Sequence, residues 1–466
     1  MANSSADGSL GSLGRVSLIA PPPLPTLIAE WAAIVPLICN LADQRDDYNT
    51  IGDVALRGRL FVGLFPRLGT LAGLSRLLGG GKQYLDHASN KGGSSRTVWD
   101  VNWGSVFPCA NGAVVHTISE YLLAGTQSRV RRMPETCINE ARGVDSKKPS
   151  IHADKSAGSA HTAYRRESST SRVEGQDSIR RSQTLHVYRM KRKRIARESQ
   201  RDIRGVVSSL PCQILKYVVL TGLATFLVLV GCYGTAALVV CSTTSSAVAQ
   251  TINVRRPWGY LRNNEDHSAC MLVAAHENAV EWHLYIGDRA VVDTILNKPM
   301  FGIASDAATR YAARWFWVAH LLQLAAMTFV AAQKGWDGVC MVLLLIGQWA
   351  SSSFHSSRAL CVEWLKTEGV DAEVKSFEFS GRSGMMGAIQ LFSQSTVTRW
   401  MDTILVPHPR REVWLERLTG GTDDVNLSSH DEIWTKNMTD VSRVSAAVLQ
   451  EEFSEEHATM SVEVKV

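Results

Sequence analysis

Two histidines, His276 and His283, are the first candidates for chemistry, because Glu277 lies directly beside one of them. The segment HENAV at 276–280 begins like the zinc-protease motif H-E-x-x-H, in which both histidines bind the metal and the glutamate is the base. Val280 occupies the position of the second ligand, however, and His283 comes seven residues after His276. We therefore expect no metal site, and we interpret the two histidines as ordinary polar residues on a helix face.

Two glycine-containing motifs are incomplete. The segment GGGK at 79–82 resembles part of a phosphate-binding loop. Arg76 occupies the position of that loop's first glycine, and Gln83 occupies the position of the Ser or Thr after the lysine. The segment GRSG at 381–384 stops one glycine short of a nucleophile elbow, because position 385 is Met. We predict no catalytic residue and no cofactor, and a non-enzymatic protein is favoured over an enzyme.

His320 and Gln323 lie inside an apolar stretch, 311–333. A polar side chain at membrane depth is costly, which makes an ionisable one a functional candidate. The alternative is that a neutral His320 bonds a neighbouring helix, with Gln323 or Gln348 as its partner. His116 and Glu120 are four residues apart and would pair on one helical face.

A basic cluster precedes the longest uncharged stretch of the chain. Each Lys or Arg near an anionic leaflet contributes about 1 kcal/mol of attraction, so we predict that the cluster binds anionic lipid headgroups. The alternative is that these residues are solvated and only determine topology. The whole-chain charge of +5 does not indicate nucleic-acid binding. The cluster consists of Arg189, Lys191, Arg192, Lys193, Arg194 and Arg197.

Asn426 and Asn437 begin acceptor sequons for N-glycosylation, which takes place only in the secretory lumen. Basic residues next to a membrane helix stay in the cytosol, so the cluster predicts a cytosolic segment before the first membrane helix. Three crossings would then place the C-terminal segment in the lumen as a glycoprotein. The inverted topology is the main alternative.

The 466 residues are 45% hydrophobic and 20% charged, which excludes a wholly disordered chain. Nine scattered cysteines, with no C-x-x-C pair, disfavour a disulfide scaffold. Charge is uneven: residues 126–210 hold 20 basic and 9 acidic residues, and residues 421–466 hold 3 and 10. We expect the first segment to be a disordered linker and the second a disordered tail.

Three apolar stretches predict membrane helices. No charge occurs from Tyr217 to Asn253, and about 20 apolar residues suffice to cross a bilayer, so one long helix is expected there. Residues 311–333 and 338–354 predict an antiparallel hairpin, because only four residues separate them. Weaker segments at 24–41, 56–78 and 106–123 bring the expected number of crossings to between three and six. The second of these has the basic amphipathic pattern of an interfacial helix.

Two segments between these helices have α/β patterns. Residues 271–280 predict a helix, the alternation of Trp282, Leu284 and Ile286 predicts a strand, and 290–296 predicts a second helix. Residues 358–367 and 385–392 predict helices on either side of an alternating strand, 370–379. Because the hairpin returns the chain to the same side, these pieces could form one small α/β unit.

The predicted fold class is therefore a mainly α, polytopic membrane protein with a small α/β extramembrane part. The expected units are membrane-associated helices in 1–125, a basic cytosolic linker in 126–212, a transmembrane helix in 213–250, an α/β segment in 251–310, a transmembrane hairpin in 311–354, a second α/β segment in 355–420 and an acidic tail in 421–466.

Several segments of the chain are similar to an uncharacterised group of fungal multi-pass membrane proteins. They are ISEYLLAG with RVRRMPETC, NNEDHSACMLVAAHENAVEWHLYIGDRAVVDTILNKPMF, FVAAQKGWDGV and FEFSGRSGMMGA. Some proteins of this group are encoded beside secondary-metabolite genes, which implies an accessory role. The group offers no catalytic residues to transfer.

Three functions follow as hypotheses. The first is a non-enzymatic integral membrane protein of the plasma membrane or an endomembrane, with the bilayer and protein partners as ligands. The second is an accessory transport or export protein of a fungal secondary-metabolite pathway, which would use His320, Gln323, His116 and Glu120. The third is a membrane-bound enzyme that uses the His276–His283 region.

Overall fold

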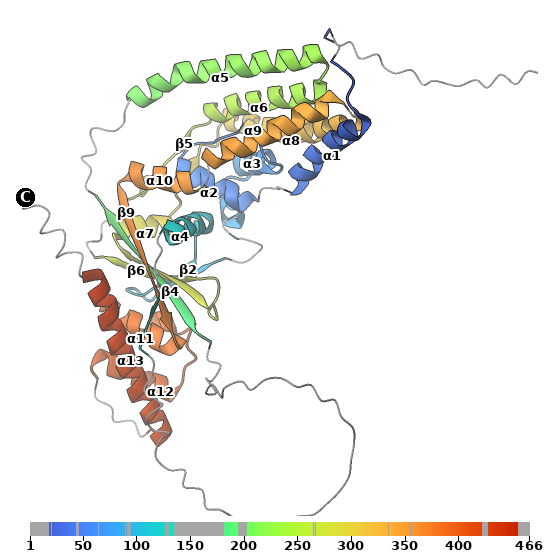
Figure 1. The fold of residues 1–466 in the computed structure, drawn as a ribbon. Coiled ribbons are helices and arrows are strands. Elements are labelled where there is room, and N and C mark those ends of the chain that lie inside the picture. The colour runs from blue at the N-terminus through green and yellow to red at the C-terminus, as the bar shows by residue number, and fades with distance from the viewer. Residues whose placement is uncertain are drawn as a thin grey trace, which may run out of the picture.

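The fold is taken from a computed structural model. It describes residues 18–19, 21–42, 46–63, 65–88, 90, 95–125, 130–134, 181–193, 203–263, 265, 267–333, 335–354, 357–421 and 427–454. A mixed sheet lies in the middle of the described chain, with a layer of apolar helices at one end and a group of polar helices at the other (Figure 1).

Seven strands form the sheet in the order β2-β1-β6-β7-β4-β9-β3. β4 and β7 are parallel, as are β3 and β9, and the other neighbours are antiparallel. A separate two-stranded sheet pairs β5 with β8. The strands are β1 (Thr97–Asp100), β2 (Val106–Pro108), β3 (Arg131–Arg132), β4 (Gln183–Arg192), β5 (Val254–Arg255), β6 (Ala269–Ala274), β7 (Glu281–Gly287), β8 (Gly302–Ile303) and β9 (Val370–Phe379).

The alternation of side chains along β4 divides the core into two. Tyr188 and Met190 face a core that they share with α2 (Asp47–Arg57), α4 (Gly112–Gly125), α7 (Arg289–Leu296) and α10 (Ser357–Glu368). Leu185 and Val187 face the opposite core. That second core is closed by α11 (Arg382–Ser393), η1 (Arg399–Met401), α12 (Pro409–Thr419) and α13 (Ser429–Ser454). Successive side chains of a strand point to opposite faces, so β4 contributes to both cores.

The turn after β7 requires glycine. Gly287 has φ +112°, and a Cβ at this position would lie 2.2 Å from the main-chain oxygen of Met190. Asp288 follows, and its carboxylate accepts a hydrogen bond from Ala290 N (2.8 Å) at the start of α7. A short side chain with an oxygen acceptor is favoured at this helix position.

The apolar helices run side by side at one end of the molecule (Figure 1). α6 packs between α5 and α8, α3 packs on α8, and α1 packs on α9. We call α1, α5, α6, α8 and α9 the apolar layer. The bounds are α1 (Thr26–Ala42), α3 (Thr70–Ala88), α5 (Ile203–Val230), α6 (Tyr233–Thr251), α8 (Ala307–Gln333) and α9 (Trp336–Phe354).

The prediction of a polytopic membrane protein is wrong. Within the described residues, only α8 is by itself long and apolar enough to cross a bilayer, and α1 with α2 would add one only as a span bent by 75°. The apolar parts of α5 and α9 (Ile214–Val230 and Trp336–Ala350) have at most 17 residues. About 20 are needed to cross. The predicted fold class is therefore wrong. The description as a multi-pass transmembrane protein is wrong too, and so is the multi-pass localisation in the plasma membrane or an endomembrane.

The single transmembrane helix expected in 213–250 is two helices. α5 ends at Val230 and α6 begins at Tyr233, and Gly231 between them has φ +83°. The chain reverses there, and α5 lies along α6 (Figure 1). Gly populates this conformation without the steric cost that other residues meet, so the break falls at the glycine. The predicted topology depended on three crossings. Without them, the cytosolic linker and the luminal C-terminus are no longer supported.

The expected disordered linker and tail both contain structure that closes the core. Residues 126–212 include β4, the longest strand of the sheet together with β9, and the start of α5. Residues 421–466 include α13, which packs on α11 and α12. High local charge hid both elements, because charged residues occupy the C-terminal end of β4 and exposed positions along α13.

Other predicted elements have mixed outcomes. The strand at 282–286, the helices at 290–296, 358–367 and 385–392, and the strand at 370–379 are confirmed. So is the joining of both α/β segments, because β6, β7 and β9 belong to one sheet. The helix expected at 271–280 is wrong, since 269–274 form β6. Residues 106–123 form β2 and then α4, and 56–78 contain the end of α2 and the start of α3.

Candidate functional site

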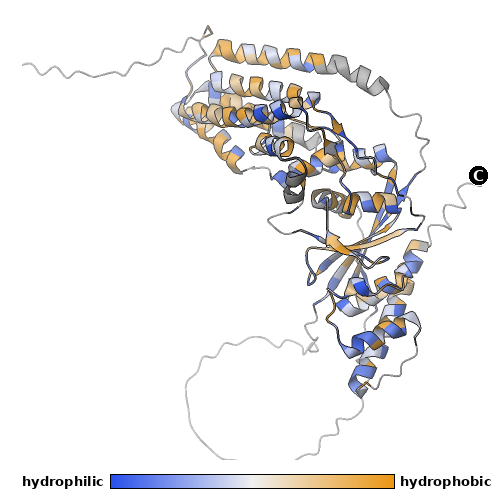
Figure 2. Ribbon diagram, turned by 180° about the vertical axis from the view of Figure 1, so that it is seen from behind, coloured by the Kyte–Doolittle hydropathy of each residue, from blue (hydrophilic) through white to orange (hydrophobic). Residues whose placement is uncertain are grey.

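The apolar layer exposes many large hydrophobic side chains. On α1, Trp31 is 66% exposed and Ile38 is 57% exposed, and on α9, Trp349 is 74% exposed. Hydrophobic residues cover this end of the molecule, whereas hydrophilic residues are frequent on the helices at the other end (Figure 2). Large exposed apolar side chains on several neighbouring helices are typical of a contact with lipid or with another protein. Further exposed members are Leu27, Ile28, Ile34, Leu41, Ile214, Leu215, Val218, Val219, Phe226, Val240, Tyr311, Trp317, Val318, Leu321, Leu322, Phe329, Leu343 and Ile346.

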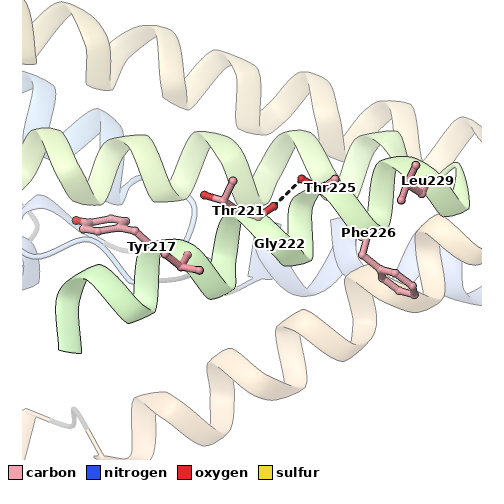
Figure 3. Close-up of a pocket in the computed structure, with 7 residues that line it drawn as sticks. Tyr217, Thr221, Gly222, Thr225, Phe226 and Leu229 are labelled. Carbon is pink, nitrogen blue, oxygen red and sulfur yellow. Dashed lines mark hydrogen bonds between the residues drawn. The ribbon is translucent and has the colours of Figure 1, made fainter. Parts of the chain in front are cut away.

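The outermost helix, α5, carries a shallow apolar groove of about 570 Å³. Its lining comes from α5 alone (Figure 3). The Thr225 hydroxyl in the groove donates to the Thr221 main-chain oxygen (2.9 Å), so it needs no partner from outside. A Cβ on Gly222 would meet nothing within 4 Å. The lining residues are Tyr217, Val218, Thr221, Gly222, Thr225, Phe226 and Leu229.

Polar groups inside the layer are used for packing between helices. Gln323 of α8 is buried and donates through Nε2 to the Pro66 oxygen (2.6 Å). His320 lies beside Trp317, with ring centroids 6.1 Å apart, and its buried Nδ1 has no hydrogen-bond partner in the described structure. Gln323 is thus bonded to Pro66, and the structure does not show the expected bond from His320 to Gln323 or Gln348.

The residues of the transport hypothesis are not gathered at one site. His116 and Glu120 pair on α4, with 4.0 Å between Nε2 and Oε2, as the sequence predicted. His320 and Gln323 lie on α8, in the apolar layer. α4 instead packs on α2, α7, α10 and β9. No observation therefore favours a shared polar path.

A second candidate site lies inside the sheet, on the face covered by α4. β4 and β7 are parallel neighbours, and their register places His186 opposite His283 and Tyr188 opposite Tyr285. The two imidazole rings stack with centroids 5.5 Å apart, and the two phenol rings stack at 4.8 Å. We call these four residues, with Ser119, Glu281 and Ser376, the polar column.

Hydrogen bonds and ring stacking together connect the polar column from its open end to its buried end. Glu281, whose side chain is 59% exposed, lies 3.2 Å from His186 Nε2 and 4.0 Å from His283 Nε2. Tyr188 Oη lies 3.1 Å from His283 Nδ1. Ser119 donates to the Val115 oxygen (2.6 Å), so in its 2.8 Å contact with Tyr285 it must be the acceptor.

Burial determines the protonation of the column. It lowers the pKa of His283 to about 3, and repulsion from Arg96 and from the protonated forms of His186 and His116 acts in the same direction. Burial also lowers the pKa of His186, although Glu281 opposes the shift. Burial raises the pKa of both tyrosines, because an ionised phenolate would be poorly solvated. Both imidazoles are therefore neutral and both phenols are protonated at pH 7.

One row of the column resembles an activated hydroxyl. A carboxylate only accepts, so His186 Nε2 donates to Glu281, and Nδ1 then accepts from the Ser376 hydroxyl at 2.8 Å. A hydroxyl that is hydrogen-bonded to an imidazole, which is in turn hydrogen-bonded to a carboxylate, can be activated as a nucleophile. Ser376, however, is buried in β9 with 4% exposure. In this conformation the hydroxyl therefore has little surface open to a substrate, and its contact with His186 joins β9 to β4 within the sheet.

The structure separates the two histidines singled out from the sequence. His283 belongs to the polar column, whereas His276 is exposed in the loop after β6, where its Nδ1 accepts from Asn278 N (3.1 Å). No group of three or more metal-binding side chains occurs among the residues that the structure describes. Sequence reasoning missed His186, Tyr188 and Ser376, although the alternation in QTLHVYRM was a signal for a half-buried strand.

Three of the six residues of the predicted lipid-binding cluster lie in β4. Arg189 donates to the Phe453 oxygen (2.8 Å) and Arg192 donates to the Leu261 oxygen (2.7 Å), so both guanidinium groups bind the protein itself. Lys191 is the next-to-last residue of β4, and Lys193 pairs with Asp371 at 3.7 Å. Arg194 and Arg197 lie outside the described residues.

The two sequons have different outcomes. Asn426 lies outside the described residues. Asn437 is half-buried in α13, and the hydroxyl of Thr439, the third residue of its sequon, is buried and donates to the Thr435 oxygen (2.8 Å). Acceptor sequons are used on surface loops, so a formed α13 disfavours a glycan at Asn437.

The chain matches no protein-family model, no curated protein and no solved structure. The resemblance to fungal membrane proteins therefore stays a prediction, and a functional proposal has to rest on the geometry of the two candidate sites.

Proposed function

We propose that this protein binds a lipid bilayer through the apolar layer and holds its α/β sheet at the membrane surface. Lipid acyl chains are the ligand class that needs no hydrogen-bonding groups. Most of the large exposed side chains on α1, α5, α8 and α9 are aliphatic, and only the tryptophans and Tyr311 among them carry a hydrogen-bonding group. Removing them from water is favourable by about 25 cal/mol per Å² of apolar surface.

The burial of α8 carries the proposal. Only 28% of its most apolar window is buried inside the protein. The core helix of a water-soluble fold is mostly buried, because the protein itself supplies the apolar environment. A bilayer would supply that environment to the exposed side chains of this window. α8 is the one described helix that could cross the bilayer unaided.

A flotation experiment tests the proposal. The purified full chain is mixed with phosphatidylcholine vesicles and centrifuged through a density gradient. We expect it to float with the vesicles in 1 M salt and after alkaline carbonate washing, because apolar contacts are insensitive to both. Adding phosphatidylserine should change the bound fraction little, since Arg189 and Arg192 are bonded within the protein.

Matched variants identify the surface. In the first variant Trp31, Ile34 and Ile38 on α1, all at least 49% exposed, are replaced by serine. Each large side chain contributes roughly 1 kcal/mol or more when fully transferred, so partitioning should fall by at least about tenfold. The control replaces Val406, Ile433 and Val444, which are similarly exposed but lie outside the layer, by serine. Equal loss in both variants, or a monodisperse protein that ignores vesicles, would refute the proposal.

A further inference from the structure

Two cysteine side chains are in contact where α5, α6 and α9 pack together. Cys232 Sγ lies 3.8 Å from Cys340 Sγ, although the residues are 108 positions apart in the chain. Cys232 precedes the first residue of α6, directly after the break at Gly231, and is 1% exposed. Cys340 lies in the second turn of α9 and is partly exposed. Neither cysteine is in a disulfide in this structure.

A carboxylate holds the two helices in this arrangement. The Asp337 oxygens accept hydrogen bonds from Gly234 N and Thr235 N, each at 2.8 Å, and the main-chain oxygen of Asp337 accepts from the Thr235 hydroxyl at 2.9 Å. Residues three apart on a helix share a face. The same contacts that bind the first turn of α6 to α9 therefore hold the sulfur of Cys340 against Cys232.

We propose that Cys232 and Cys340 form a redox-active pair, which a small disulfide such as glutathione disulfide oxidises to an intramolecular disulfide. A disulfide bond is about 2.05 Å long, so the sulfurs have to approach by less than 2 Å from their present contact. This movement requires side-chain rotation, and neither sulfur belongs to a metal-binding group or a disulfide in the described structure.

The reaction takes place in two exchanges. The more exposed Cys340 thiolate attacks one sulfur of glutathione disulfide, whose S–S bond breaks and whose leaving thiolate takes up the proton lost by Cys340. Cys232 then attacks the Cys340 sulfur of the mixed disulfide and displaces the second glutathione. The two protein thiols are oxidised by two electrons, and one glutathione disulfide is reduced to two glutathione molecules.

Oxidation would cross-link the turn between α5 and α6 to α9. The closed loop contains β6, β7, α7 and α8. A cross-link over so many residues restricts the unfolded chain strongly. The pair would therefore lock the inner helices of the apolar layer together under oxidising conditions and release them under reducing ones.

Thiol counting and mass spectrometry test the proposal on the full chain in detergent micelles. The protein is exposed to glutathione disulfide, unfolded and alkylated with iodoacetamide, and its peptides are mapped. We expect one linked peptide pair joining Cys232 to Cys340, reversed by dithiothreitol. The thermal unfolding midpoint should be higher for the oxidised protein than for the reduced one.

Single variants separate the two exchanges. Cys232→Ser should trap glutathione on Cys340, because the second thiol is missing, whereas Cys340→Ser should leave the buried Cys232 reduced. Cys39→Ser is the control, since Cys39 is an exposed cysteine on a different helix, α1; it should leave the link intact. Recovery of both Cys232 and Cys340 as alkylated thiols after oxidation of the wild type, or no glutathione on Cys340 in Cys232→Ser, would overturn the proposal.

Discussion

His283 illustrates how a single residue couples stability to pH. Its ring lies between His186 and Tyr188 in the buried sheet face, and burial lowers its pKa to about 3. In the unfolded chain the same residue takes up a proton near pH 6.5. Between these values the unfolded state binds more protons than the folded state, so stability falls as pH falls through this window.

We expect the free energy of unfolding to decrease by about 1.4 kcal/mol per pH unit below pH 6 through His283 alone. His283→Gln keeps a hydrogen-bonding side chain but cannot titrate, so the dependence between pH 6 and 4 should become shallower. Urea unfolding at a series of pH values measures this. His276→Gln, at an exposed position, serves as the control, and an unchanged slope in His283→Gln would contradict the predicted burial.

At the scale of elements, the start of α6 depends on α9. The first amide groups of a helix have no partner within it, and here a buried carboxylate from another helix accepts from two of them. The negative charge of Asp337 also lies at the positive end of the α6 dipole. The break between α5 and α6 is therefore stabilised by a tertiary contact as well as by the backbone of Gly231.

We predict that Asp337→Ala lowers the free energy of unfolding by roughly 2–4 kcal/mol, because it removes a cap and leaves two buried amides without acceptors. Asp337→Asn keeps one acceptor oxygen and should lose less. Chemical unfolding followed by circular dichroism measures both. Equal stability of Asp337→Ala and the wild type would show that water or another group satisfies the amides.

At the scale of the whole molecule, elements distant in the chain close the fold together. β1 pairs with β6, and β3 pairs with β9, so the residues before 135 contribute strands to a sheet completed by residues after 181. α1 packs on α9 and α3 packs on α8 in the same way. A cut between the two parts should leave these contacts intact.

We therefore predict that a protease site inserted after Ala160 yields two fragments that remain associated after cleavage. The fragments should co-elute in gel filtration and separate only in denaturant, because strand pairing and helix packing both join them. The uncut protein with the same insertion is the control. Separation of the fragments in native buffer would contradict the pairing of β1 with β6 and of β3 with β9.

The sequence by itself determined the local structure wherever one periodicity dominated. The alternation in 282–286 and 370–379 predicted β7 and β9, and the apolar runs predicted α8 and α9, because a strand or helix with one consistent face needs little context. The pairing of His116 with Glu120 was also local, since it follows from helical spacing.

Only the tertiary structure decided which apolar and polar segments share a core. The C-terminal end of β4 is strongly charged, and for this reason the sequence predicted a disordered linker there. Pairing with β7 and β9 nevertheless buries the other side chains of β4. The polar column requires β4, β7, β9 and α4 at once, so no single stretch could reveal it. The number of long apolar helices was likewise a tertiary result, because the chain turns back at Gly231 and packs α5 against α6 instead of continuing as one helix.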